Sequence, residues 1–223
     1  MQLSNFKAII FDCDGVLVNS EVIHMAVERE LLSELGLEYD HATYLLRFVG
    51  LSNPDYYRHL NEDFAERVGG IFPEDFGDRL EARTWPRIEA ELSAIDRIAE
   101  LLKALDRPVA VASSAPIKKL QRKLEITGLA RLFAPHIYSV DHVSRGKPAP
   151  DLFLHAAQAL GVDPVNCAVI EDSVHGIRAA QAAGMTPIGF VGGGHADAGL
   201  PSRLKDSGAA IVATDHAQLL SLI

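Results

Sequence analysis

Short apolar runs that alternate with helix-length segments are the feature that most constrains the fold of this chain. Strands that alternate with helices predict the α/β class, with a doubly wound, Rossmann-like parallel sheet covered on both faces. The helix-length segments cover residues 117–126, 151–160 and 176–183, and glycines follow the last two. The apolar runs that we expect to form buried strands are residues 8–11, 109–112, 137–138, 168–170, 188–191 and 210–213.

One long segment differs in composition from the rest of the chain. Residues 16–92 contain sixteen acidic and seven basic side chains, a formal charge of −9, whereas the remainder is balanced. The segment holds no lysine, because the first lysine after Lys7 is Lys103. It has no strand-like runs, and helical spacing recurs at residues 21–35, 55–68 and 74–92. We therefore expect an α/β core domain formed by residues 1–16 and 93–223, with a helical domain inserted at residues 17–92.

The bulk composition excludes several classes of protein. The chain is 48% hydrophobic, which is too apolar for a disordered protein. Its net charge of −9 argues against nucleic acid or an anionic membrane as a partner. Two cysteines are too few for a disulfide framework, and no apolar stretch reaches the roughly 18 residues of a membrane span. We expect a soluble, cytoplasmic protein, and nothing in the sequence demands more than a monomer.

Polar side chains follow three of the predicted strands and lie in one turn. Asp12 and Asp14 emerge from the first strand, and Gly15 lets the chain turn away there. The adjacent carboxylates Glu171 and Asp172 repel each other unless a cation lies between them. Three further candidates each have a plainer alternative: Ser113 and Ser114 offer donors to phosphate oxygens or cap a helix, and Lys147 is held by nearby prolines or is an ordinary surface lysine.

These motifs resemble those of the haloacid dehalogenase-like phosphotransferase superfamily. The resemblance is to its β-phosphoglucomutase-like branch, which carries a helical cap domain after the first strand. It covers essentially the whole chain and rests on four motifs in the order of the family: FDCDGVLVNSE, VAVASS, GKPAPD and VIEDSVHGI.

The resemblance implies a role for each residue of these motifs. Asp12 would be the nucleophile that forms an aspartyl-phosphate, and Asp14 would be the general acid and base. Ser113, Ser114 and Lys147 would bind the phosphoryl oxygens. Mg²⁺ would be held by Asp12, Asp172 and the backbone carbonyl of Asp14, with Glu171 bound to the ion directly or supporting its ligands.

Two residue patterns separate the chemistries of this superfamily. Its dehalogenases lack the second aspartate, so Asp14 favours phosphoryl transfer. Its phosphonate-cleaving members use a cap lysine to form a Schiff base, and residues 16–92 contain no lysine. We therefore expect the substrate to be a small phosphorylated metabolite. A non-catalytic binding module with the same fold is a remote alternative, because no catalytic group is missing.

Hydrolysis and mutase activity are distinguished in the helical segment. In the mutases a Lys-Gly-Val-Ser-Arg loop holds a second phosphate, and the matching basic positions here are Val49 and Asn53. This difference favours a phosphatase, with a sugar-phosphate mutase as the alternative. His24, Arg47 and Asn53 are the candidate substrate contacts of this segment. His24 matches a histidine that the mutases use near the substrate and that many phosphatases of this branch also carry, and Arg47 either contacts a substrate carboxylate or phosphate or is solvated. The pattern around Arg47 and Gly50 resembles members of the 6-phosphogluconate phosphatase type.

The remaining histidines and one glycine run carry no predicted role. His195 and the others show no metal-ligand spacing. The run at residues 192–194 does not precede a helix as a phosphate-binding loop does, and we interpret it as a flexible loop.

Overall fold

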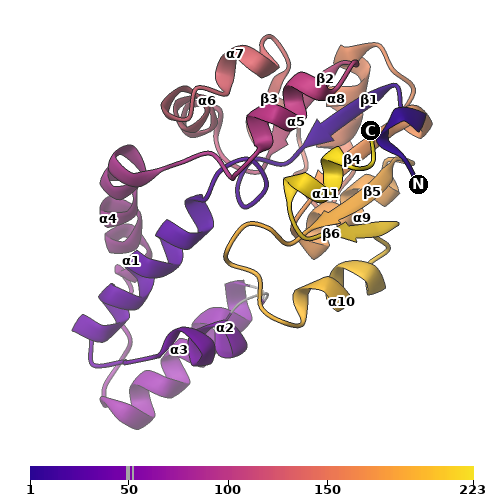
Figure 1. Ribbon diagram of the computed structural model, residues 1–223. Coiled ribbons are helices and arrows are strands. Elements are labelled where there is room, and N and C mark those ends of the chain that lie inside the picture. The colour runs from indigo at the N-terminus through magenta and orange to yellow at the C-terminus, as the bar shows by residue number, and fades with distance from the viewer. Residues whose placement is uncertain (49–50, 52) are drawn as a thin grey trace. The chain divides into compact units, whose positions relative to one another are not determined.

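The computed structural model describes residues 1–48, 51 and 53–223, without the side chain of Asn53. The chain divides into two compact units (Figure 1). One contains Met1–Glu21 and Leu92–Ile223, and the other contains Val22–Glu91. The sequence predicts a helical domain at residues 17–92, and the smaller unit spans Val22–Glu91.

The larger unit is built on a six-stranded sheet in which every pairing is parallel (Figure 1). The strand order is β3-β2-β1-β4-β5-β6, so β1 lies between β2 and β4. This order places the carboxyl ends of β2, β1 and β4 side by side. The strands are β1 (Ala8–Phe11), β2 (Val109–Ser113), β3 (Ile137–Ser139), β4 (Cys167–Glu171), β5 (Thr186–Phe190) and β6 (Ile211–Ala213), which confirms the predicted α/β sheet.

Successive residues of β1 face opposite sides of the sheet and contact different helices. The Phe11 ring packs edge to face on Phe133 of α7, with ring centroids 5.8 Å apart. Ile10 belongs instead to a buried cluster with Phe153 of α8. Burying each such side chain stabilises the fold by about 1.5–3 kcal/mol. The helices of this unit are α5 (Ile98–Ala104), α6 (Ile117–Ile126), α7 (Ala130–Phe133), α8 (Asp151–Leu160), α9 (Val174–Ala182), α10 (Leu200–Asp206) and α11 (His216–Leu220), with 3₁₀ turns at Leu3–Asn5, Val140–His142 and Pro164–Asn166.

Within its described residues, the smaller unit has helices as its regular elements. It holds a core of its own, in which Phe64, Phe72 and Phe76 form successive ring contacts. The helices are α1 (Ser20–Glu34), which begins in the larger unit, α2 (His41–Phe48), α3 (Asn53–Arg67) and α4 (Phe76–Glu91). The sequence predicted α1, α3 and α4 but not the short α2.

Across residues 1–48, 51 and 53–223, no helix has both the length and the apolar character that crossing a membrane needs.

Candidate active site

Three neighbouring strands bring buried polar side chains to one edge of the sheet. Asp12 directly follows β1, and its amide donates to the Ile170 carbonyl of β4 at 2.9 Å. Ser113 is the last residue of β2, and Asp172 directly follows β4. All three are buried, with 1–8% of their surface exposed. The strand order therefore gathers the side chains that the sequence motifs singled out.

Lys147 contacts residues at the carboxyl ends of all three strands. Its Nζ lies 2.5 Å from Asp12 Oδ1 and 2.7 Å from Glu171 Oε1, and it donates to the Ala112 carbonyl at 2.9 Å. Burial alone would lower the pKa of Lys147, but the Asp12 and Glu171 carboxylates raise it above its ordinary value. Only 4% of this side chain is exposed, so Lys147 is a buried cation and not a surface lysine.

Glu171 is held on both of its oxygens. Oε1 accepts from Lys147, while Oε2 accepts from the Ser173 amide at 2.9 Å and from the Ser173 hydroxyl at 2.8 Å. A Cβ at Gly176 would lie 1.8 Å from the Glu171 carboxyl group, so only glycine fits against it. These contacts fix the Glu171 carboxylate beside the ammonium group of Lys147. A direct contact between Glu171 and a metal stays a prediction.

Ser113 and Ser114 do not cap the following helix. The residue before α6 is Pro116, and no side chain caps that end. Ser113 Oγ instead accepts from the Ala115 amide at 3.0 Å, which leaves its hydroxyl proton available to an anion. Ser114 is exposed. Binding of phosphate by these two residues stays a prediction.

His195 contacts the site, a position that no sequence motif predicts. Its Nε2 lies 3.1 Å from Asp172 Oδ2. Burial would lower the pKa of His195, but Asp172 raises it to about 9. Gly193, two residues before His195, is buried, and a Cβ there would lie 2.4 Å from the Gly15 carbonyl oxygen. This part of the glycine run is therefore closely packed. The available signal was the position of His195, five residues beyond β5 on the same sheet edge.

Asp14 is also held by residues that the sequence did not single out. Lys123 of α6 and the Ser20 hydroxyl both donate to Asp14 Oδ1. Burial would lower the pKa of Lys123, but Asp14 raises it above its ordinary value. The signal in the sequence was a lysine between Leu120 and Leu124, on the apolar face of a helix.

The donors at this edge fit a magnesium ion. Burial raises the pKa of both Asp12 and Asp172, to about 6 for Asp172, and carboxylate oxygens are the ligands that Mg²⁺ prefers. A Cβ at Gly15 would lie 1.9 Å from Asp172 Oδ2, so the backbone after Asp14 lies directly against this carboxylate. Among the described residues, no three His, Cys, Asp or Glu side chains cluster as metal ligands. Two carboxylates, one backbone carbonyl and water molecules would not form such a cluster.

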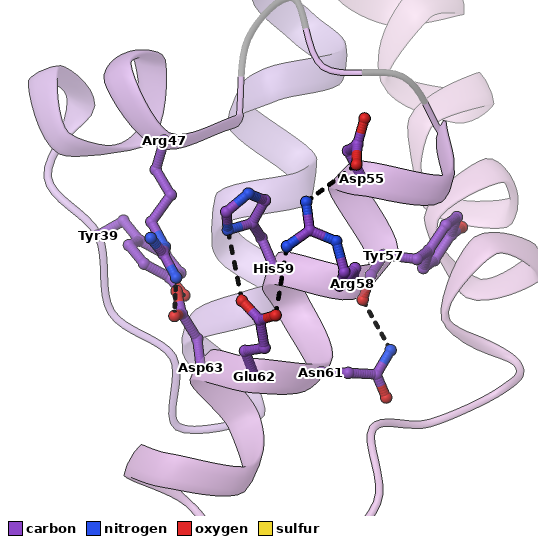
Figure 2. Close-up of polar contacts among 9 residues, drawn as sticks. All are labelled: Tyr39, Arg47, Asp55, Tyr57, Arg58, His59, Asn61, Glu62 and Asp63. Atoms are coloured by element: carbon purple, nitrogen blue, oxygen red, sulfur yellow. Dashed lines mark hydrogen bonds and ion pairs between the residues drawn. The ribbon is translucent and has the colours of Figure 1, made fainter.

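The other candidate residues belong to the helical unit. His24 Nδ1 lies 3.6 Å from Glu28 Oε2, one turn further along α1. Arg47 is engaged by Asp63 of α3, which accepts from both Nε and Nη2 and from the Tyr39 hydroxyl (Figure 2). The residues at 49, 50 and 52 and the Asn53 side chain lie outside the described part of the chain. Substrate binding by His24, Arg47 and Asn53 stays a prediction.

The Arg47–Asp63 pair leads to a prediction about stability. We expect Arg47→Met to lower the free energy of unfolding by about 1–2 kcal/mol at pH 7, because it leaves a buried carboxylate short of donors while water partly screens the pair. Burial alone would raise the pKa of Asp63, but Arg47 and Tyr39 hold it below its ordinary 3.8. The stabilisation is therefore fully present above pH 3.8 and is lost as the pH falls through the lowered pKa of Asp63. The unfolding free energies of the wild type and Arg47→Met should converge in acid.

The measurement is urea unfolding between pH 7 and pH 3, followed by fluorescence of Trp85, which is the single tryptophan and lies in α4. Arg58→Met is the matched control, because Arg58 is 55% exposed and pairs with Asp55 and Glu62 on the surface of α3 (Figure 2). It should change stability little. A raised KM with unchanged stability in Arg47→Met would instead identify Arg47 as a substrate contact.

Comparison with known proteins assigns this arrangement to a family. The family model of haloacid dehalogenase-like hydrolases matches residues 6–184. The chain belongs to this family, which confirms the resemblance seen in its motifs.

Individual relatives indicate which kind of hydrolase the chain is. A 6-phosphogluconate phosphatase of Escherichia coli (strain K12) is 30% identical over 193 residues, which cover 86% of each chain. A fructose-1-phosphate phosphatase of the same organism is 32% identical over 191 residues, 82% of this chain and 95% of the relative. A crystal structure of a HAD family hydrolase from Deinococcus radiodurans R1, with bound phosphate and sodium, superposes with a TM-score of 0.84 at 38% identity and covers 98% of both chains. The chain is thus an enzyme of the phosphoric monoester hydrolase class.

Proposed function

We propose that the protein is a Mg²⁺-dependent phosphatase that hydrolyses a sugar phosphate or sugar-acid phosphate through an aspartyl-phosphate. The observation that carries this proposal is the contact of buried Asp12 with Lys147 at the sheet edge, flanked by Ser113 and Asp172 on the neighbouring strands. A nucleophile beside a buried cation suits a reaction in which a phosphoryl group must be both attacked and neutralised. The names of the two relatives support sugar-type substrates.

The residues of the site supply the steps of this reaction. A carboxylate oxygen of Asp12 attacks phosphorus, the bond from phosphorus to the ester oxygen breaks, and Asp14 gives a proton to the departing alcohol. Water then attacks phosphorus of the aspartyl-phosphate, Asp14 takes up a proton of that water, and the Asp12 carboxylate is restored. Lys147 and the Ser113 hydroxyl would bind phosphoryl oxygens throughout. Asp12, Asp172 and the Asp14 carbonyl would hold Mg²⁺, and the bound ion would supply positive charge near the nucleophile and the phosphate.

The helical unit, Val22–Glu91, would act as the cap domain that selects the substrate and excludes water during the reaction. This role follows the family resemblance of the inserted segment. A sugar-phosphate mutase is the competing function, and the loop that distinguishes it from a phosphatase includes residues outside the described part of the chain.

The test is phosphate release from sugar, polyol and sugar-acid phosphates, including 6-phosphogluconate and fructose 1-phosphate. We expect turnover with Mg²⁺ and a loss of at least about 10²-fold with EDTA, because the ion contributes several kcal/mol to the transition state. Excess Mg²⁺ should restore the rate. Hydrolysis that is indifferent to the chelator would contradict the proposal. Interconversion of hexose 1- and 6-phosphates that outpaces phosphate release would establish the mutase instead.

A further inference from the structure

Lys123 is a buried lysine whose contact is with the predicted general acid and base. Only 8% of its surface is exposed, and its neighbours Leu120 and Leu124 on α6 are fully buried. Lysine rarely occupies such a position unless an anion pairs with it. The partner here is the Asp14 carboxyl group, whose Oδ1 can accept from Lys123 Nζ whether or not Oδ2 carries a proton.

The Asp14 carboxylate is held from one side. The Ser20 hydroxyl donates to the same oxygen as Lys123, and Oδ2 accepts no hydrogen bond from any residue that the structure describes. Asp14 lies in the loop after β1, just before the turn at Gly15, where φ is +73°. A short side chain on a loop gains a defined direction when one of its two oxygens is fixed by two donors.

We propose that Lys123 is a positioning residue that, with Ser20, holds Asp14 by Oδ1 and directs Oδ2 toward the ester oxygen of the substrate. This inference rests on the proposed phosphatase function. In the first step the proton on Oδ2 passes to the ester oxygen while the bond from phosphorus to that oxygen breaks. A misdirected Asp14 would slow this transfer without removing the Asp12 nucleophile or the phosphate-binding residues.

The role of Lys123 is tested by comparing two kinds of leaving group. An alkyl phosphate, such as the sugar phosphate hydrolysed best, needs a proton as the alcohol departs, whereas p-nitrophenyl phosphate releases a stable phenolate. Values of kcat/KM report the steps up to departure of the alcohol or phenolate. A difference between the two esters in kcat/KM therefore reports proton donation to the leaving group. General acid catalysis contributes about 10²- to 10⁴-fold, and we expect Asp14→Asn to lose this factor on the alkyl phosphate only.

Lys123→Met should reproduce part of this pattern. We expect a loss of at least about tenfold on the alkyl phosphate and little loss on the aryl phosphate. Lys123→Arg keeps a donor and should retain more activity, and Ser20→Ala should give a smaller shift of the same kind. Because Lys123 acts through Asp14, adding Lys123→Met to Asp14→Asn should cost nothing further. Lys103→Met, an exposed position on α5, is the matched control.

Each outcome decides between the two proposals. An equal loss on both substrates, or multiplied losses in the double variant, would overturn the positioning role and leave Lys123 as a structural residue. If Lys123→Met does not fold, an unchanged ratio of the two substrates in Ser20→Ala and Lys123→Arg would overturn it equally. A wild-type protein that hydrolyses neither ester would overturn both proposals. If the wild type and Asp14→Asn behave as expected but Lys123→Met changes kcat/KM on neither substrate, this inference alone would be overturned.

Discussion

Replacing Asp12 with asparagine is expected to lower kcat for phosphate-ester hydrolysis by at least about 10⁴-fold, because the amide cannot serve as the attacking carboxylate. The substitution changes almost no volume. Lys147 keeps two of its partners, the Glu171 carboxylate and the Ala112 carbonyl. We therefore expect a folded protein whose melting temperature is close to that of the wild type.

The Asp12→Asn rate is measured as phosphate release under saturating substrate and Mg²⁺, together with a thermal melt of the same sample. Asp206→Asn is the matched control, since Asp206 is an exposed acid at the end of α10, and this change should leave kcat unaltered. A folded Asp12→Asn protein that retains even about one per cent of wild-type turnover would show that another group attacks phosphorus.

The elements around the site were predictable where their signals are local. The sequence predicted α8 with its observed bounds, because Pro150 precedes the helix and Gly161 ends it with a positive φ of 67°. The central strand β1 is buried along its whole length and reads as a short apolar run. Since parallel strands in such a sheet present their carboxyl ends at one edge, Asp12 and Asp172 could be placed on that edge from the sequence.

The contacts that the sequence did not reveal join distant parts of the chain. Lys123 and Asp14 are separated by 109 positions, and α6 reads as an ordinary amphipathic helix. His195 lies beyond a glycine run that has no motif of its own. The helical segment shows the same limit: its net charge of −9 does not indicate that Glu28 and Asp63 are buried, which their partners Tyr56, Arg47 and Tyr39 make possible.

The second large effect is expected at Lys147, which neutralises two buried carboxylates. Lys147→Met leaves Asp12 and Glu171 without their shared cation, and removal of one partner from a buried ion pair costs about 3–5 kcal/mol of stability. Because Lys147 opposes the effect of burial, its loss also raises the pKa of Asp12 further and disfavours the ionised nucleophile. Together with the lost contact to phosphoryl oxygens, these effects should lower kcat/KM by at least about 10³-fold.

Stability and catalysis at Lys147 can be separated with a second substitution. In the double variant Lys147→Met, Glu171→Gln, one of the two unpaired charges is removed, so denaturant unfolding should show part of the lost stability restored. Activity should not return, because the ammonium group of Lys147 no longer faces Asp12 and the phosphoryl oxygens. Lys103→Met again serves as the control for removal of an exposed lysine. Recovery of activity along with stability would show that Lys147 supports the fold of the site but does not stabilise the reacting phosphoryl group.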